Sequence, residues 1–181
     1  MLLITIPAVE LWDERNEVFI STDAKTLQLE HSLVSLSKWE SRWEKPFLSN
    51  KPKTEEETLD YVRCMTLTQN VKPDVYIRLS DQNILAINQY IDAPMTATHF
   101  SKDDGPRRNG GEQITAELIY YWMVALNIPF ECQKWHLNRL FTLIRICNIK
   151  NQPPKRQSRR SIMNRNAALN ASRRKRLNTK G

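Results

Sequence analysis

The chain has 181 residues, of which 40% are hydrophobic and 26% are charged, a composition typical of a globular protein and not of a wholly disordered or fibrous one. The formal net charge of +7 is unevenly distributed. Residues 150–181 contain 11 lysines and arginines and no acidic residue, which leaves 16 basic and 20 acidic residues in the rest of the chain. The sequence therefore predicts a slightly acidic folded body and a separate basic tail.

The N-terminal part of the body has the pattern of a β-hairpin. Residues 2–6 and 17–21 are short apolar runs, and the polar turn formers of residues 13–16 lie between them. We expect strands at both runs and a turn between them, in a hairpin or a small meander.

The apolar period then changes to that of a helix. Residues 32–43 place Leu33, Leu36, Trp39 and Trp43 near helical spacing, which predicts a helix that ends before Pro46. The following Thr54-Glu55-Glu56-Glu57 segment matches a capping box and predicts a second helix from there to about residue 67. Three carboxylates in a first turn also suit the helix dipole, so we interpret them as a helix start and not as an acid–base site.

Further helices are expected in the second half of the body. Ser80 is a good N-cap for a helix that reaches Pro94, and it carries Ile84, Leu85, Ile87 and Ile91. Residues 95–111 hold three of the four glycines and read as a mobile loop. Residues 114–127 and 131–148 have apolar residues three and four apart, which predicts a helix hairpin.

The predicted fold class is mainly α with a small N-terminal β-hairpin (α+β), followed by a basic tail. The expected divisions are a hairpin region at 1–30, a helical domain at 31–150 and a tail at 151–181 that begins near the Gln152-Pro153-Pro154 sequence. The tail has too few large apolar residues to fold alone, and we expect it to become helical against a partner.

No segment indicates secretion or a membrane. The apolar start at residues 1–7 lacks the basic residues of a signal peptide, and residues 114–130 are too short and too polar to span a bilayer. Three widely spaced cysteines fit a reducing cytoplasm.

Catalytic and metal-binding patterns are weak. The sequence has no phosphate-binding glycine loop and no nucleophile elbow, so we expect a binding protein and not an enzyme. Cys132 and His136, four apart on a predicted helix, would supply only two of the four ligands that zinc needs. We expect no metal and no cofactor.

The basic tail is the strongest candidate for partner contact. Its charges repel one another unless an acidic surface is near, and that surface could be nucleic acid or protein. A flexible solubilising tail is the alternative interpretation. Trp39 and Trp43 are weaker candidates, because tryptophan is frequent at binding hot spots but is more often a core residue. The predicted partner-binding residues are Arg159, Arg160, Arg173, Arg174, Lys175, Arg176, Trp39 and Trp43.

Several segments across most of the chain resemble small proteins encoded in the tail modules of long-tailed bacteriophages, often described as tail assembly chaperones. The similar segments are residues 28–41 (QLEHSLVSLSKWES), 56–66 (EETLDYVRCMT), 93–98 (APMTAT), 114–123 (ITAELIYYWM), 135–140 (WHLNRL) and 166–170 (NAALN). The resemblance implies a mostly helical, non-enzymatic protein made in the cytoplasm of the host bacterium. Its expected partners are the tape measure protein, a long helix-rich chain that sets tail length, and tail tube subunits. Self-association is left open, and no membrane partner is expected.

Two other function classes remain open at this stage. The first is a structural virion component of the neck, head-completion or baseplate type, whose basic tail contacts DNA or a neighbouring subunit. The second is a DNA-binding regulator built on residues 114–148. The second is less favoured, because the apolar residues of 131–148 suit a buried helix better than a base-reading one.

Overall fold

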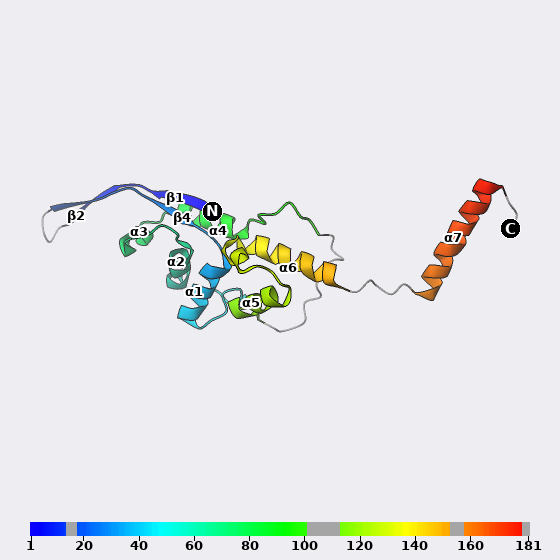
Figure 1. The fold of residues 1–181 in the computed structure, drawn as a ribbon. Helices are drawn as coiled ribbons and strands as arrows, with labels where there is room; N and C mark the ends of the chain where they lie inside the picture. Colours follow the sequence, from blue (N-terminus) through cyan, green and yellow to red (C-terminus); the bar gives the residue numbers. More distant parts are fainter. Residues whose placement is uncertain (14–17, 101–112, 153–157, 179–181) are drawn as a thin grey trace. The chain divides into compact units, whose positions relative to one another are not determined.

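The computed structural model of this chain describes residues 1–13, 18–100, 113–152 and 158–178 (Figure 1). It is mainly helical with a small N-terminal antiparallel β-structure, which confirms the predicted α+β class. The chain divides into two compact units, Met1–Lys150 and Asn151–Gly181. No helix among the described residues combines the length and the apolar character needed to cross a bilayer.

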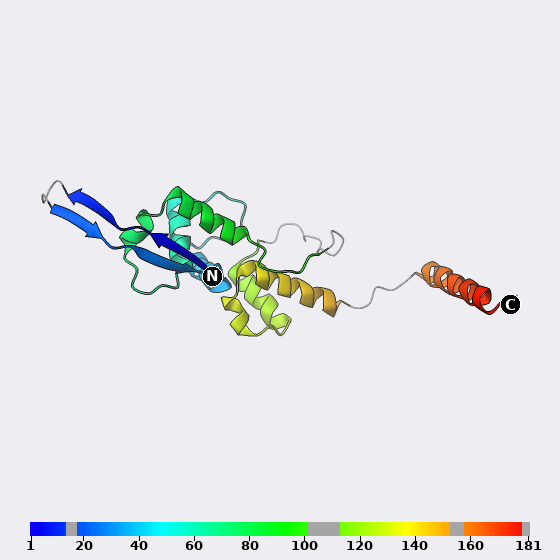
Figure 2. The same ribbon diagram turned by 90° about the horizontal axis from the view of Figure 1, so that it is seen from above.

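The N-terminal strands form a long two-stranded ribbon. Strand β1 (Leu2–Ile6) pairs with β4 (Lys25–Leu29), and β2 (Val9–Asp13) pairs with β3 (Val18–Thr22), both antiparallel. The β2–β3 end extends beyond the helices (Figures 1 and 2). The predicted strand at 17–21 is β3, but the predicted hairpin needs a correction, because β3 pairs with β2 and residues 2–6 pair with β4. Residues 14–16 of the predicted turn lie outside the described residues.

The β1–β4 end of the ribbon is amphipathic. Ile4, Ile6, Leu27 and Leu29 are buried, whereas the residues that alternate with them are exposed, as expected for a sheet with one face on a core. At the interruption between the two pairs, Arg78 Nη1 donates to the Pro7 carbonyl at 3.2 Å and to Thr22 Oγ1 at 2.8 Å. This side chain anchors the base of the ribbon to the helical part.

Helices α1 (Leu33–Trp43) and α2 (Glu55–Met65) both begin with a capping box. At α2 the Glu57 amide donates to Thr54 Oγ1 at 3.2 Å, and the Thr54 amide donates to Glu57 Oε2 at 2.8 Å. The predicted starts of both helices are confirmed. Each cap satisfies amides that the first helical turn leaves without an intrahelical acceptor.

The next two helices are short. Helix α4 (Asp81–Asp92) begins at the Ser80 N-cap as predicted, but Leu85 is 58% exposed, and Ile87 and Tyr90 are its buried residues. Helix α3 (Pro73–Ile77) was not predicted, because five residues are too few for an apolar period. Its proline occupies a first-turn position, where the missing amide costs no hydrogen bond.

The predicted hairpin of helices at 114–127 and 131–148 needs a correction. The first is α5 (Ala116–Ala125), but the second region contains a 3-10 turn, η2 (Phe130–Lys134), and then α6 (Leu137–Asn151). His136 forms an antiparallel bridge with Ser32, and the Leu137 amide donates to the His31 carbonyl at 2.7 Å. These contacts hold residues 135–136 in an extended conformation, so Cys132 and His136 are not one helical turn apart.

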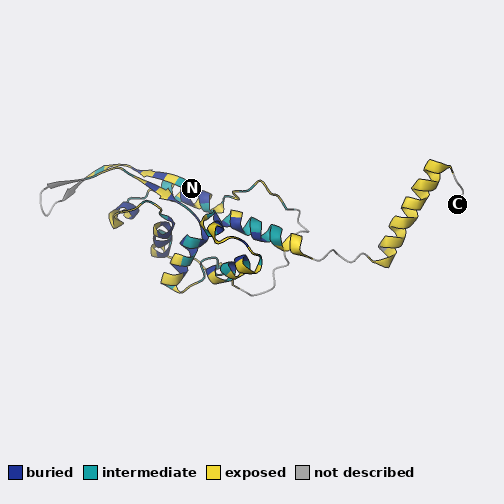
Figure 3. Cartoon of the chain, viewed as in Figure 1, coloured by how far each residue is buried: buried dark blue, intermediate teal, exposed yellow. Residues whose placement is uncertain are grey.

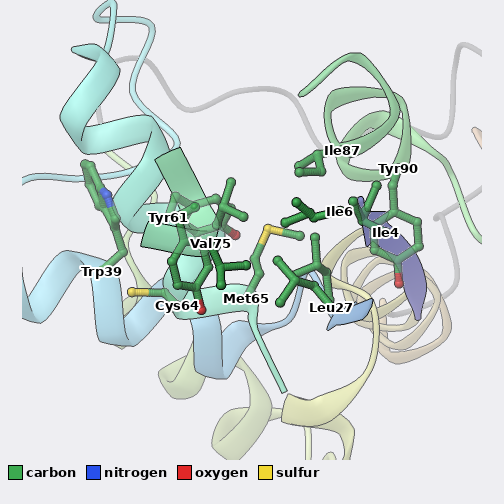
Figure 4. Packing of buried hydrophobic residues seen from close by; sticks show 13 residues of the cluster. Ile4, Ile6, Leu27, Trp39, Tyr61, Cys64, Met65, Val75, Ile87 and Tyr90 are labelled. Atoms are coloured by element: carbon green, nitrogen blue, oxygen red, sulfur yellow. The ribbon is translucent and has the colours of Figure 1, made fainter. Parts of the chain in front are cut away.

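Two apolar clusters share helix α1. The first lies between the β1–β4 pair and helices α1 to α4 and includes Trp39, Tyr61 and Met65 (Figure 4). The second lies between α1, α5, η2 and α6 and includes Leu33, Leu36 and Leu140. The first half of α1 thus contributes Leu33 and Leu36 to the second cluster, whereas Trp39 belongs to the first, and the helix joins the two.

Candidate partner-binding surfaces

The second unit contains a long cationic helix, α7 (Arg159–Leu177). Alanine, arginine, lysine and leucine are strong helix formers, and the cations in its last turn complement the negative end of the helix dipole. Asn178 follows with φ 50°, a left-handed conformation that asparagine tolerates and that ends helices. The sequence predicted that this segment becomes helical only when it binds a partner. In the structure of the single chain it is already helical.

The predicted tail residues all lie on α7. Every side chain of the helix whose burial is described is exposed (Figure 3). Arg173, Arg174, Lys175 and Arg176 are consecutive, and each points about 100° away from the one before it around the helix axis. Their charges therefore surround the helix, and a flat partner surface can contact only part of the group.

Four apolar side chains of α7 are also exposed. Ile162, Met163, Leu169 and Leu177 fall within about 120° of the helix circumference, but Arg159, Asn166, Asn170 and Arg173 are interleaved with them in that sector. The exposed fractions of the four apolar side chains range from 38% for Ile162 to 71% for Met163. They therefore form no continuous apolar face, and the helix is polar all round.

The predicted contact residue Trp39 is a core residue. Its ring is 1% exposed, and its Nε1 donates to the Glu57 carbonyl at 2.8 Å. It stacks on Trp43 with ring centroids 6.1 Å apart and meets the Phe47 ring edge-on at 5.0 Å. A ring enclosed in this way is not accessible to a partner, so the partner-contact interpretation of Trp39 is wrong.

Trp43 is half-buried at the edge of the same cluster. Its Nε1 donates to Asp60 Oδ2 at 3.0 Å, and Lys45 Nζ lies 5.6 Å from its ring centroid. The ring therefore has a defined orientation and remains partly exposed.

A cationic groove lies between α1 and α2, and no pattern in the sequence predicts it. It is open, has a volume of about 600 Å³, and is lined by Lys38, Ser41, Arg42, Arg63 and Cys64. Lys38 and Arg42 are one helical turn apart on α1, which the sequence does show. Arg63 joins them because α2 packs against α1, and no local pattern predicts that contact.

Two carboxylates of α2 face cations of α1 or of the residues after it. Asp60 pairs with Arg42, and Glu57 pairs with Lys45 at 2.6 Å, while both carboxylate side chains are 5% exposed. The hydrogen bond from Lys45, together with the Thr54 amide, lowers the pKa of Glu57. These pairs fix α1 against α2 and position the walls of the groove.

Helix α5 presents an apolar outer face. Tyr121 is 65% exposed and Val124 is 60% exposed, and Phe130 at the start of η2 is 54% exposed. The Tyr120 ring, which is half-buried, lies 6.4 Å from the Phe130 ring and connects the two parts. Large exposed apolar side chains of this kind are typical of interaction surfaces.

A buried polar junction joins the two apolar clusters. His31 Nδ1 and the Tyr61 hydroxyl share a hydrogen bond of 2.6 Å, and the His31 and His136 rings meet edge-on at 5.1 Å. His136 Nε2 donates to the Tyr90 carbonyl at 2.9 Å, and the Tyr90 hydroxyl donates to Glu30 Oε1 at 2.7 Å. The second oxygen of Glu30 is 2.9 Å from the N-terminal amino group.

Burial controls the ionisation of both histidines in this junction. It lowers the pKa of His31 to about 3, with a smaller contribution from His136, and it also lowers the pKa of His136. Both rings are therefore neutral near pH 7. The Asn138 amide donates to His136 Nδ1 at 3.3 Å, so both nitrogens of that ring are already occupied.

Metal-ligating side chains do not gather anywhere in the described part of the chain. Groups of three or more histidine, cysteine, aspartate or glutamate side chains that could hold an ion are absent from residues 1–13, 18–100, 113–152 and 158–178. Comparison of the chain with protein families, with characterised proteins and with solved structures finds no match in any of the three.

Proposed function

We propose that this chain is a non-enzymatic tail assembly chaperone of a long-tailed bacteriophage, which binds the tape measure protein in the host cytoplasm and helps to recruit tail tube subunits. The observation that carries the proposal is helix α7. Its 19 residues include seven lysines and arginines and no acidic residue, and it follows a folded unit of opposite net charge. An exposed cationic helix suits recognition of an acidic surface on another protein.

The apolar outer face of α5 supports the same proposal. A chaperone for a long helix-rich client must cover apolar stripes that would otherwise aggregate, and aromatic and aliphatic faces perform this role in helix-in-groove recognition. Tyr121, Val124 and Phe130 supply such a face on the first unit. Cationic and apolar surfaces on one chain could thus bind different stretches of a client.

Co-expression with the tape measure protein of the same phage tests the proposal. We expect the tape measure protein to stay soluble only when this chain is present, which fractionation and gel analysis would measure. Equal solubility without the chain would contradict the proposal. A structural virion component would instead be found in purified virions at a fixed copy number, whereas a chaperone would be absent from them.

Helix α7 has its own test. Replacing Arg173, Arg174, Lys175 and Arg176 with serine should weaken tape measure binding on the order of 30-fold at low salt, because several exposed charge contacts are lost together. Binding is measured by fluorescence anisotropy. The unfolding temperature of the first unit should be nearly unchanged, because the four replaced residues lie in the second unit. Tryptophan fluorescence measures this temperature, since all five tryptophans precede residue 151.

A matched control keeps the charge of α7. Replacing Asn164, Asn166 and Asn170 with serine alters exposed polar residues of the same helix, and binding should stay within about twofold of the original chain. Unaltered binding by the four-serine variant would contradict the role of α7. Unfolding of the first unit would show instead that the cluster belongs to the core.

A further inference from the structure

The groove between α1 and α2 is cationic on a unit that is otherwise acidic. Lys38, Arg42 and Arg63 line it together with the Ser41 hydroxyl, and the open volume is about 600 Å³. The first 149 residues carry more acidic than basic side chains, 20 against 16. Three cations at one groove are thus a local reversal of the charge of this unit.

Two of these cations have no carboxylate partner among the described residues. Asp60 is already engaged by Arg42 and by Trp43 Nε1 at 3.0 Å, and neither Lys38 nor Arg63 is within ion-pair distance of a described carboxylate. The Arg63 guanidinium lies 5.4 Å from the Tyr76 ring centroid, an aromatic contact that favours one orientation of the side chain. The groove therefore offers ordered positive charge that the fold itself does not neutralise.

Cys64 adds no negative charge to this site. Its side chain is 8% exposed, and burial raises the pKa of the thiol, so the sulfur stays protonated near neutral pH. Because the Arg42 guanidinium is already paired with Asp60, the ligand chemistry is set mainly by the Lys38 ammonium, the Arg63 guanidinium and the Ser41 hydroxyl. These groups match carboxylates, which guanidinium binds through two parallel hydrogen bonds and ammonium binds as a point charge.

From this arrangement we infer that the α1–α2 groove binds an acidic segment of a partner protein. The two cations without a carboxylate partner come from different helices, Lys38 from α1 and Arg63 from α2. A segment that carries several carboxylates can pair with both of them. A nucleic acid is less suited, because its long row of phosphates would also meet the acidic remainder of the unit.

The inference does not depend on which partner α7 recognises. The groove is built from α1 and α2 of the first unit, whereas the proposed chaperone function rests mainly on α7. If the groove does not bind an acidic segment, the proposed chaperone function still stands, and the reverse is also true. To keep α7 from competing for the probe, the four-serine variant of residues 173–176 serves as the background for the test.

The probe is an alanine-rich helical peptide with glutamate at every fourth position. We expect it to shift the backbone amide resonances of α1 and α2 around Lys38, Arg42 and Arg63 in the isotope-labelled full chain. Replacing Lys38 and Arg63 with glutamine should weaken binding about fivefold to tenfold, because two partly exposed charge pairs are lost. Arg42 is left in place, because its removal would leave the buried Asp60 carboxylate without its cation.

The control removes the same charge elsewhere on the first unit. Replacing Lys134 and Lys150, both exposed and outside the groove, with glutamine should weaken binding less than twofold. Equal weakening by the two variants, or amide shifts that bypass α1 and α2, would overturn the inference. Binding of a single-stranded oligonucleotide in the groove in preference to the peptide would also overturn it, in favour of a nucleic-acid site.

Discussion

Replacing Glu40 with alanine is expected to lower the free energy of unfolding of the first unit by about 3–5 kcal/mol, because it leaves two backbone amides without an acceptor. Glu40 is buried in α1, where Oε1 accepts from the Phe47 amide at 2.8 Å and Oε2 accepts from the Ala116 amide at 2.7 Å. One side chain thus joins α1 to the segment after it and to the first turn of α5. Urea unfolding followed by tryptophan fluorescence measures the change.

Two further variants separate the causes of this loss. Glu40→Gln keeps the volume and one acceptor oxygen, so the loss should be smaller than for alanine. Glu117→Ala removes an exposed carboxylate from the same end of α5 and should cost less than about 1 kcal/mol, the usual value of a helix-dipole contact. A Glu40→Ala chain within about 1 kcal/mol of the original would contradict the proposed structural role.

The first unit should lose stability as the pH falls from about 7 towards 4. The pKa of His31 is lowered from 6.5 to about 3 in the fold, so between these values the unfolded chain binds a proton that the folded chain does not. Stability from the neutral ring is therefore complete above pH 6.5 and declines below it, by about 1.4 kcal/mol per pH unit for this histidine. His136, whose pKa is also lowered, adds to the loss in the same direction.

A non-titrating side chain isolates the contribution of His31. The free energy of unfolding of a His31→Gln chain should fall by about 2–3 kcal/mol less between pH 6.5 and 4.5 than that of the original chain. Urea unfolding at both pH values provides the comparison. His99→Gln, the same substitution at an exposed histidine outside this junction, is the matched control. Identical pH dependence in the His31→Gln and original chains would refute the assignment.

Several helix starts could be predicted because their signals are local. Ser32, Thr54, Ser80 and Thr115 each cap a helix through contacts within a few positions of the chain. The strands at residues 2–6 and 17–21 were equally accessible, because they are short apolar runs of consecutive residues. Their pairing was not, since β1 pairs with β4 and β3 pairs with β2.

The errors arose where distant segments meet. The apolar period of residues 131–148 continues through His136, yet the bridge to Ser32 interrupts the helix there. Trp39 and Trp43 share a helical spacing, but the packing of α2 and Phe47 over α1 encloses Trp39 and leaves part of Trp43 accessible. The helical spacing showed that both tryptophans lie on one face of α1, but it could not show how deeply each side chain is buried.

The sequence by itself determined the helix caps, the amphipathic strands and the separation of a basic tail from an acidic body, because each depends on composition or on neighbours along the chain. The tertiary structure alone decided three features. These are the Glu40 contact with an amide 76 positions away, the histidine junction between the two clusters, and the meeting of Arg63 with Lys38 and Arg42. The physical reason is that burial and electrostatic neighbourhood depend on which surfaces pack together, and α1 contributes to both clusters through side chains that the sequence shows as a single periodic face.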